Sequence, residues 1–223
     1  MMLCIPEILN REELQRLRTA LASAEFVDGK TTAGYRAIRV KNNMQLPQDS
    51  QLSKDISVLI ERALRRNRTF DWAIWPKLIR GILVSRYEPG MQYGYHVDDA
   101  LKRKPEPSRT DVAFTIFLSD PTDYDGGELV IDAGLGPQEI KLAAGEGVVY
   151  PASTLHRVAE VTRGRRVVAV GWVQSQVRDP AQREILYDLE RIKRLLAEKM
   201  PDAPETDWAF KTQANLLRMW ADP

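Results

Sequence analysis

Residues 78–99 read LIRGILVSRYEPGMQYGYHVDD, and this stretch decides the fold of the chain. Apolar and polar residues alternate on both sides of Pro89-Gly90, a pair that marks a turn. The stretch is therefore predicted to form two strands, near 78–87 and 94–99. The same period of two continues for another 75 residues. It predicts six further strands, near 111–118, 127–131, 138–142, 147–150, 155–160 and 165–174. Eight short strands at this spacing indicate a double-stranded β-helix, the jelly-roll arrangement of two packed sheets.

Helical patterns precede this β region. Asn10 followed by Glu13 is a capping-box pattern, and leucines at helical spacing come after it, which predicts a helix over about 11–24. A second helix is predicted around 52–63. Between the two helices, alternation over 35–40 predicts a strand. These elements are expected to support the β region.

The helical pattern returns after Gln176. Ile185, Leu189, Ile192 and Leu196 form one apolar stripe, so a helix is predicted over about 180–199, packed on the barrel or on a second subunit. The fold class is therefore mixed and mainly β, a double-stranded β-helix with N-terminal and C-terminal α-helices. It divides into a support region, a β-helix domain and a helical extension that offers a surface for a homo-oligomer, with the boundaries 1–76, 77–177 and 178–223.

Composition describes an ordinary globular chain of 223 residues, 43% of them hydrophobic. Its 32 basic and 31 acidic residues leave a net charge of +1, which gives no global field to recruit nucleic acid or an anionic membrane. Cys4 is the single cysteine, so an intrachain disulfide is excluded and a reducing compartment fits. Since no stretch resembles a signal peptide or a membrane span, a cytoplasmic location is expected.

The two histidines of the chain, His96 and His156, point to a metal site. On a strand, His96 and Asp98 project to the same face, whereas Asp99 turns to the opposite face. His156 is the only further histidine, and it would complete a set of two histidines and one carboxylate. That set leaves coordination positions open and is typical of non-haem Fe(II) oxygenases. A lone histidine is more often a surface or core residue, but the joint pattern is much harder to obtain by accident.

An arginine accompanies this pattern. Arg166 stands ten residues after His156, at the start of the last predicted strand. A guanidinium fork pairs with carboxylates through two parallel bonds, so Arg166 is the predicted partner of a dicarboxylate co-substrate. Arg157 and Arg165 are the alternative cations for that role.

With these residues in place, the chain resembles the PKHD-type hydroxylases, a bacterial branch of the Fe(II)/2-oxoglutarate-dependent dioxygenases with a member associated with iron uptake. The resemblance covers nearly the whole chain. It rests on RYEPGMQYGYHVD at 86–98, DGGEL at 125–129, the segments 151–158 and 162–166, QSQVRD at 174–179 and NLLRMW at 215–220.

The resemblance implies a catalytic centre in which His96, Asp98 and His156 hold Fe(II), and in which Arg166 pairs with the far carboxylate of 2-oxoglutarate. It further implies O2 as co-substrate, L-ascorbate as auxiliary reductant, and decarboxylation of 2-oxoglutarate to succinate coupled to hydroxylation of an unidentified small-molecule or peptidyl substrate. The hydroxyls of two further residues are candidates for contacting a co-substrate carboxylate, namely Tyr87 and Thr115.

Two other classes of function remain open from the residues alone. Double-sheet barrels also host cupin-like metal-dependent isomerases and small-molecule binders, although such sites usually use more histidines and a glutamate. The chain could instead be an iron-responsive or oxygen-responsive interaction protein that acts through its helical tail. Turnover of 2-oxoglutarate in the absence of substrate distinguishes the three classes.

Overall fold

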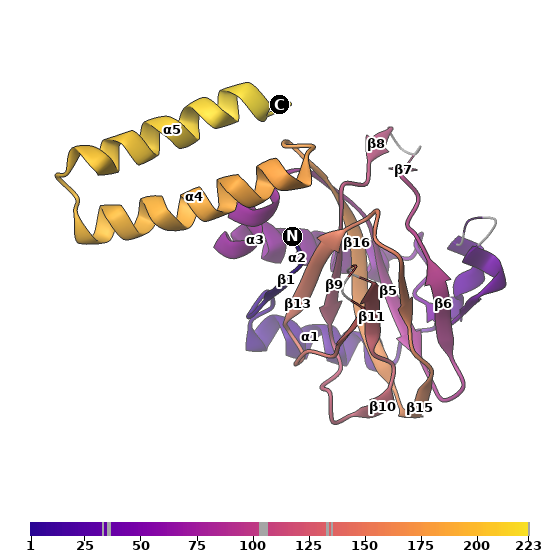
Figure 1. Ribbon diagram of the computed structural model, residues 1–223. Coiled ribbons are helices and arrows are strands. Elements are labelled where there is room, and N and C mark those ends of the chain that lie inside the picture. The colour runs from indigo at the N-terminus through magenta and orange to yellow at the C-terminus, as the bar shows by residue number, and fades with distance from the viewer. Residues whose placement is uncertain (33, 35–36, 103–106, 133, 135, 223) are drawn as a thin grey trace.

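The structure is a computed structural model that describes residues 1–32, 34, 37–102, 107–132, 134 and 136–222. Two antiparallel sheets lie face to face and form the barrel (Figure 1). The larger sheet has the order β1 (Leu3–Ile5), β13 (Gly147–Pro151), β9 (Val112–Phe117), β16 (Arg166–Ser175), β5 (Pro76–Tyr87), β4 (Met44–Gln45) and β2 (Val27–Asp28).

The smaller sheet supplies the opposite wall of the barrel. It has the order β12 (Pro137–Ile140), β11 (Leu129–Asp132), β14 (His156–Val158), β6 (Gln92–His96) and β3 (Lys41–Asn42). Two strand pairs extend the ends of the barrel, β10 (Tyr124–Gly126) with β15 (Val161–Gly164) and β7 (Leu101–Lys102) with β8 (Ser108–Arg109). All eight predicted strands are present in this double-stranded β-helix, so the fold class is confirmed.

Alternation along the central strands builds two separate cores. On β9, Phe114 and Ile116 face a core shared with the helices, whereas Ala113 and Phe117 face the smaller sheet. Both faces of β9 are buried, because helices cover one and the second sheet covers the other. The inner core stops short of filling the barrel, and the cavity described below lies there.

Three helices cover the outer face of the larger sheet. The capping box predicted at its start is present in α1, because Asn10 accepts a hydrogen bond from the Glu13 N–H at 2.8 Å and Glu13 accepts one from the Asn10 N–H at 3.0 Å. A helix that was not predicted, α3, follows α2 and packs against it. The bounds are α1 Arg11–Ala22, α2 Gln51–Arg66 and α3 Arg68–Ile74.

The strand predicted over 35–40 is wrong where the structure describes it. Residues 35 and 36 lie outside the described residues, and Ala37–Arg39 forms a short 3-10 helix, η2, after the similar turn η1 at Gly29–Thr32. The alternation was misleading because Ile38 and Val40 are both exposed.

A second difference concerns the metal motif. β6 ends at His96, so Asp98 lies just beyond the strand rather than on it. The chain bends there, and both side chains still face the same cavity.

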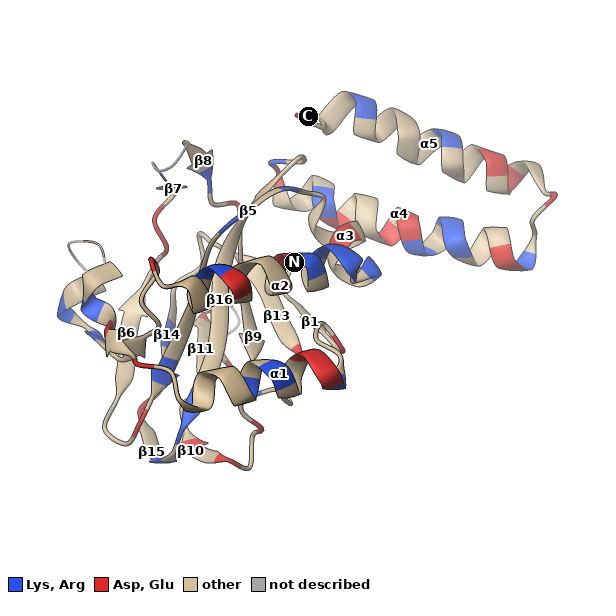
Figure 2. Cartoon of the chain, turned by 180° about the vertical axis from the view of Figure 1, so that it is seen from behind, with Lys and Arg blue, Asp and Glu red and all other residues tan. Residues whose placement is uncertain are grey.

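The C-terminal region forms a helical hairpin that extends away from the barrel (Figure 1), built from α4 (Pro180–Lys199) and α5 (Pro204–Trp220). Basic and acidic residues are interspersed along α4, whereas α5 has acidic residues in its first turn and basic residues farther on (Figure 2). Among the described residues, no helix combines the length and the apolarity that crossing a membrane requires.

The predicted stripe of α4 is not the face that the chain buries. Ile185 and Ile192 are 50% and 52% exposed, whereas Arg183, Leu186 and Glu190 are buried. Polar residues can face inward because their hydrogen bonds are satisfied there: Arg183 donates to two backbone carbonyl oxygens at 2.7 and 2.8 Å.

Glu190 joins the two helices of the hairpin, and its removal is expected to destabilise the chain. Its carboxylate accepts hydrogen bonds from Gln213 at 2.8 Å and Arg194 at 2.7 Å, and Lys193 pairs with it at 2.5 Å. Although burial acts to raise the pKa of Glu190, the bonds from Lys193 and Gln213 hold that pKa below its ordinary value. Glu190→Ala should lower the free energy of unfolding by about 2–3 kcal/mol.

Denaturant unfolding measures this change. The matched control is Glu198→Ala. Glu198 is an exposed glutamate on the same helix, and its ion pair with Lys199 is exposed to solvent. That control should lower the free energy of unfolding by less than about 1 kcal/mol. Equal losses for the two variants would show that the Glu190 network does not hold the hairpin together.

Candidate metal centre and co-substrate cavity

The two histidines meet because they are cross-strand neighbours. β14 pairs with β6 so that His156 lies directly opposite His96, although the two are 60 residues apart in the sequence. Their ring centroids are 4.3 Å apart. Asp98 joins them from the segment after β6, and one ligand atom from each of the three residues lies within 4.8 Å of the others.

Backbone carbonyls orient both imidazoles in the same way. The Nδ1–H of His96 donates to the Gly94 carbonyl at 2.8 Å, and that of His156 donates to the Thr154 carbonyl at 3.0 Å. A carbonyl oxygen only accepts, so each ring carries a proton on Nδ1, and in its neutral form the ring leaves Nε2 with a free lone pair. This arrangement is the one that metal-binding histidines use.

The electrostatics of the site keep His96 in its metal-binding form and leave Asp98 in need of a nearby positive charge. Burial, with the nearby His156, lowers the pKa of His96 to about 3, so its ring is neutral at physiological pH. Burial raises the pKa of Asp98, and His156 opposes that effect. A divalent cation would supply the charge that a buried carboxylate needs. Two imidazoles and one carboxylate therefore fit a divalent transition metal.

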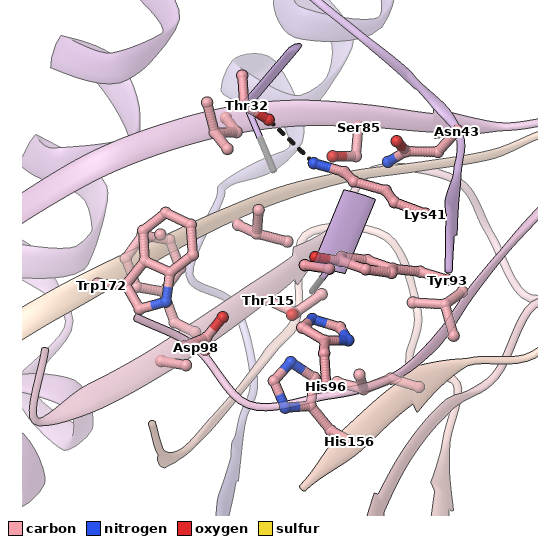
Figure 3. Close-up of a pocket in the computed structure, with 18 of the residues that line it drawn as sticks. Thr32, Lys41, Asn43, Ser85, Tyr93, His96, Asp98, Thr115, His156 and Trp172 are labelled. Carbon is pink, nitrogen blue, oxygen red and sulfur yellow. Dashed lines mark hydrogen bonds between the residues drawn. The ribbon is translucent and has the colours of Figure 1, made fainter. Parts of the chain in front are cut away.

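A cavity of roughly 800 Å³, part of it open to solvent, lies between the two sheets and contains these residues (Figure 3). Thr115 from β9 and Tyr87 from β5, the two hydroxyl residues named in the sequence analysis, both line it. Burial raises the pKa of Tyr87, so its hydroxyl stays protonated. Figure 3 shows Asp98 beside the indole of Trp172, while Thr115 lies next to His96.

Arg166 lies in the same cavity. It is the first residue of β16, it stands opposite Tyr87 in the register of β5, and it is 1% exposed. Its Nε and Nη1 have no hydrogen-bond partner within the described part of the chain. Its guanidinium instead lies 5.1 Å from the centroid of the Tyr87 ring and 5.5 Å from that of Phe117. A buried guanidinium with free donors is a ready site for a carboxylate.

The glycine turn at 125–129 makes room for this arginine. Gly127 has a φ of +67°, and a Cβ at that position would lie 3.0 Å from Cδ of Arg166. A larger residue would therefore strain the backbone and displace the arginine stem.

The alternative residues named in the sequence analysis are not part of the metal cluster. Asp99 does not turn to the opposite face as predicted but lies exposed at the rim of the same cavity, outside the three clustered ligands. Arg157 points away from the cavity and lies over the ring of Tyr95, and Arg165 is exposed and pairs with Glu88 at 3.2 Å. Neither arginine is among the residues that line the cavity.

Sequence reasoning missed one wall of the cavity. The segment 41–45 places Lys41, Asn43 and Gln45 against it, and all three are buried. Burial and the charge of Lys102 lower the pKa of Lys41 to about 8. The alternation of this short segment was available as a signal, but inward-facing polar residues invert the pattern that normally identifies a buried strand.

Comparison with known proteins agrees with this geometry. Residues 82–174 match the model of the 2OG-Fe(II) oxygenase superfamily. PKHD-type hydroxylases from Synechococcus sp. (strain JA-2-3B'a(2-13)) and Acaryochloris marina are 51% and 50% identical to this chain, and each alignment covers 100% of both sequences. A solved 2OG-Fe(II) oxygenase from Burkholderia pseudomallei shares the fold at a TM-score of 0.55 and 20% identity, over 78% of this chain and 84% of that one.

The relatives match the support region and the helical hairpin as well as the barrel, since the alignments run over the entire chain. Membership in the superfamily implies Fe(II), 2-oxoglutarate and O2 as the reagents of the enzyme. The chain therefore belongs to the PKHD-type hydroxylases of the 2OG-Fe(II) oxygenase superfamily and is a 2-oxoglutarate-dependent dioxygenase.

Proposed function

We propose that the chain hydroxylates an organic substrate at a centre where His96, Asp98 and His156 hold Fe(II) and Arg166 binds 2-oxoglutarate. One observation carries the proposal. Within one cavity, two imidazoles present free Nε2 atoms beside a carboxylate, and a buried guanidinium presents donors without partners in the described part of the chain. When bound, the metal supplies the oxygen chemistry, in which decarboxylation of 2-oxoglutarate to succinate is coupled to hydroxylation.

The residues of the chain orient the reactants and exclude water. The carbonyls of Gly94 and Thr154 hold the two imidazole rings, and the Tyr93 ring stacks on His96 with centroids 3.6 Å apart. Arg166 remains charged although it is buried, because a guanidinium keeps its proton where a lysine would lose it. The Tyr87 and Thr115 hydroxyls are proposed as additional contacts for the co-substrate carboxylates.

The proposal assigns the dioxygenase domain to 77–177, with 1–76 as its support and 178–223 as a helical extension. It includes L-ascorbate as an auxiliary reductant and a link to iron uptake, both on the basis of the family resemblance. The substrate is a small molecule or a peptidyl group small enough to enter the cavity beside 2-oxoglutarate.

Succinate release tests the proposal without knowledge of the substrate. Wild-type protein with Fe(II), 2-oxoglutarate and O2 should form succinate slowly by uncoupled turnover, and Asp98→Ala should reduce this rate to background. Asp99→Ala, a neighbouring carboxylate outside the ligand cluster, is the matched control and should keep the wild-type rate. A wild-type protein that binds Fe(II) but releases no succinate would instead support a cupin-like isomerase or an interaction protein.

A further inference from the structure

One wall of the cavity is built mostly from buried polar residues that the proposed chemistry does not use. Lys41, Asn43 and Gln45 alternate inward from the segment 41–45, and the buried Ser85 and the exposed Thr32 complete the wall (Figure 3). Polar side chains in such a position are costly unless their hydrogen bonds are satisfied.

Most of the wall is satisfied by one chain of hydrogen bonds. The Lys41 Nζ donates to the Thr32 hydroxyl at 2.9 Å, and that hydroxyl donates to the Gln45 amide oxygen at 2.5 Å. The Gln45 amide nitrogen donates to the Ser85 hydroxyl at 3.2 Å. This chain holds the wall in place and ends on Lys41.

Lys41 and Asn43 retain unused capacity. Lys41 is 5% exposed. Over the described ranges, no carboxylate lies within ion-pair distance of its ammonium. The Thr32 hydroxyl accepts a hydrogen bond from only one of the three ammonium N–H donors. Asn43 is 2% exposed, and neither its amide oxygen nor its amide nitrogen reaches hydrogen-bond geometry with a partner among those residues, although its side chain lies close enough to the Tyr87 hydroxyl to oppose the rise in the pKa of that group. A buried ammonium without a counter-ion is unfavourable, and an anionic ligand would correct this.

The described charged residues that line the cavity carry one more positive charge than negative charge. Three cations line its described part, Lys41, Lys102 and Arg166, against the two carboxylates Asp98 and Asp99. A divalent metal and a doubly charged 2-oxoglutarate would cancel each other. One positive charge is then left, and it suits a single carboxylate on the second substrate.

The wall lies close enough to the metal site for one small molecule to span both. Figure 3 shows the Tyr93 ring between Lys41 and His96. The Lys41 Nζ is 5.3 Å from the centroid of that ring, and the His96 ring is 3.6 Å from it on the other side. The ammonium is therefore no farther from His96 than the sum of these two distances, about the length of a short organic acid.

We propose that Lys41 and Asn43 bind a carboxylate of the primary substrate, so that the enzyme hydroxylates a carboxylic acid at a C–H bond a few bonds away from the acid group. The ammonium and the amide N–H donors face the same space and together match the two oxygens of a carboxylate. This inference rests on the proposed function, because it places the reacting carbon beside the metal ligands.

Fluoroacetate, observed by fluorine NMR, probes this carboxylate site directly. The protein is loaded with Zn(II) in place of Fe(II), which prevents turnover, and with saturating 2-oxoglutarate, which occupies Arg166. Fluoroacetate should bind wild type with a millimolar Kd, and fluoroacetamide, which has the same shape without the charge, should bind at least tenfold more weakly. Lys41→Met should weaken fluoroacetate binding at least tenfold.

Asn43→Leu provides a second variant of nearly the same shape, and it should weaken fluoroacetate binding threefold or more while keeping a wild-type melting temperature. Lys54→Met, an exposed lysine on α2, is the matched control and should bind as wild type does. Wild-type affinity in folded Lys41→Met, equal binding of the amide, or no binding of fluoroacetate to wild type would each overturn the inference.

Calorimetric titration of 2-oxoglutarate into the same Zn(II)-loaded samples separates this inference from the proposed function. Normal binding of 2-oxoglutarate without a fluoroacetate site rejects only the carboxylate inference. Failure of wild type to bind 2-oxoglutarate rejects the proposed function, whatever fluoroacetate does.

Discussion

Replacing Arg166 by alanine is expected to raise the 2-oxoglutarate concentration needed for half-maximal succinate formation by about two to four orders of magnitude. The side chain is fully buried, and removing one partner of a buried charged pair costs about 3–5 kcal/mol, at about 1.4 kcal/mol per factor of ten. Fe(II) affinity should change little, because Arg166 is not among the three clustered ligands. Arg166→Lys should be intermediate, since a point charge replaces the two-pronged fork.

Neighbouring arginines supply the controls for this experiment. Arg165→Ala removes the adjacent, exposed cation that pairs with Glu88, and Arg157→Ala removes the one that lies over Tyr95. Both variants should titrate 2-oxoglutarate as wild type does. A wild-type titration by Arg166→Ala would mean that another group binds the co-substrate, and loss of affinity in Arg157→Ala or Arg165→Ala would identify that group.

The second large effect is expected at the metal. His156→Ala removes one of two imidazoles whose Nε2 atoms are free, and its affinity for a divalent metal should fall by more than about 100-fold. Zn(II) at about 100 times its Kd should stabilise wild type by about 2.7 kcal/mol, which raises the melting temperature by roughly 5–10 °C for a chain of this size. His156→Ala should show almost none of this rise.

The metal-free forms of wild type and His156→Ala should melt within a few degrees of each other, since the histidine lines a cavity rather than a packed core. The control is Asp99→Ala, which should keep the full Zn(II)-dependent rise because Asp99 lies at the exposed rim. A full rise in His156→Ala would remove that histidine from the ligand set.

The barrel and the convergence of its site residues could be predicted because both follow from a period of two. Strands of that period place His96 and His156 on one face, and the antiparallel register then makes them direct neighbours. The register of β16 and β5 also places Arg166 opposite Tyr87, a pairing that the sequence did not predict.

Buried polar side chains whose hydrogen-bond partners come from distant parts of the chain could not be predicted from local sequence patterns. Arg183 and Glu190 face inward on α4 because Arg183 donates hydrogen bonds to backbone carbonyls and Glu190 accepts one from Gln213. The apolar stripe therefore did not identify the buried face. Lys41 faces the cavity with its ammonium bonded to the Thr32 hydroxyl, and a hydrophobic pattern cannot reveal an inward-facing lysine. The strand expected over 35–40 failed because its alternating residues are exposed.

The central claim is that one cavity holds Fe(II) through His96, Asp98 and His156 and binds 2-oxoglutarate beside it. Anaerobic titration of 2-oxoglutarate into the Fe(II)-loaded protein tests it most directly, because chelation of Fe(II) by a 2-oxoacid produces a visible charge-transfer absorption. We expect this absorption to saturate at one equivalent in wild type, to require far more 2-oxoglutarate in Arg166→Ala, and to be absent in His156→Ala and Asp98→Ala. An absorption of wild-type intensity in His156→Ala or Asp98→Ala, or none in wild type, would contradict the account.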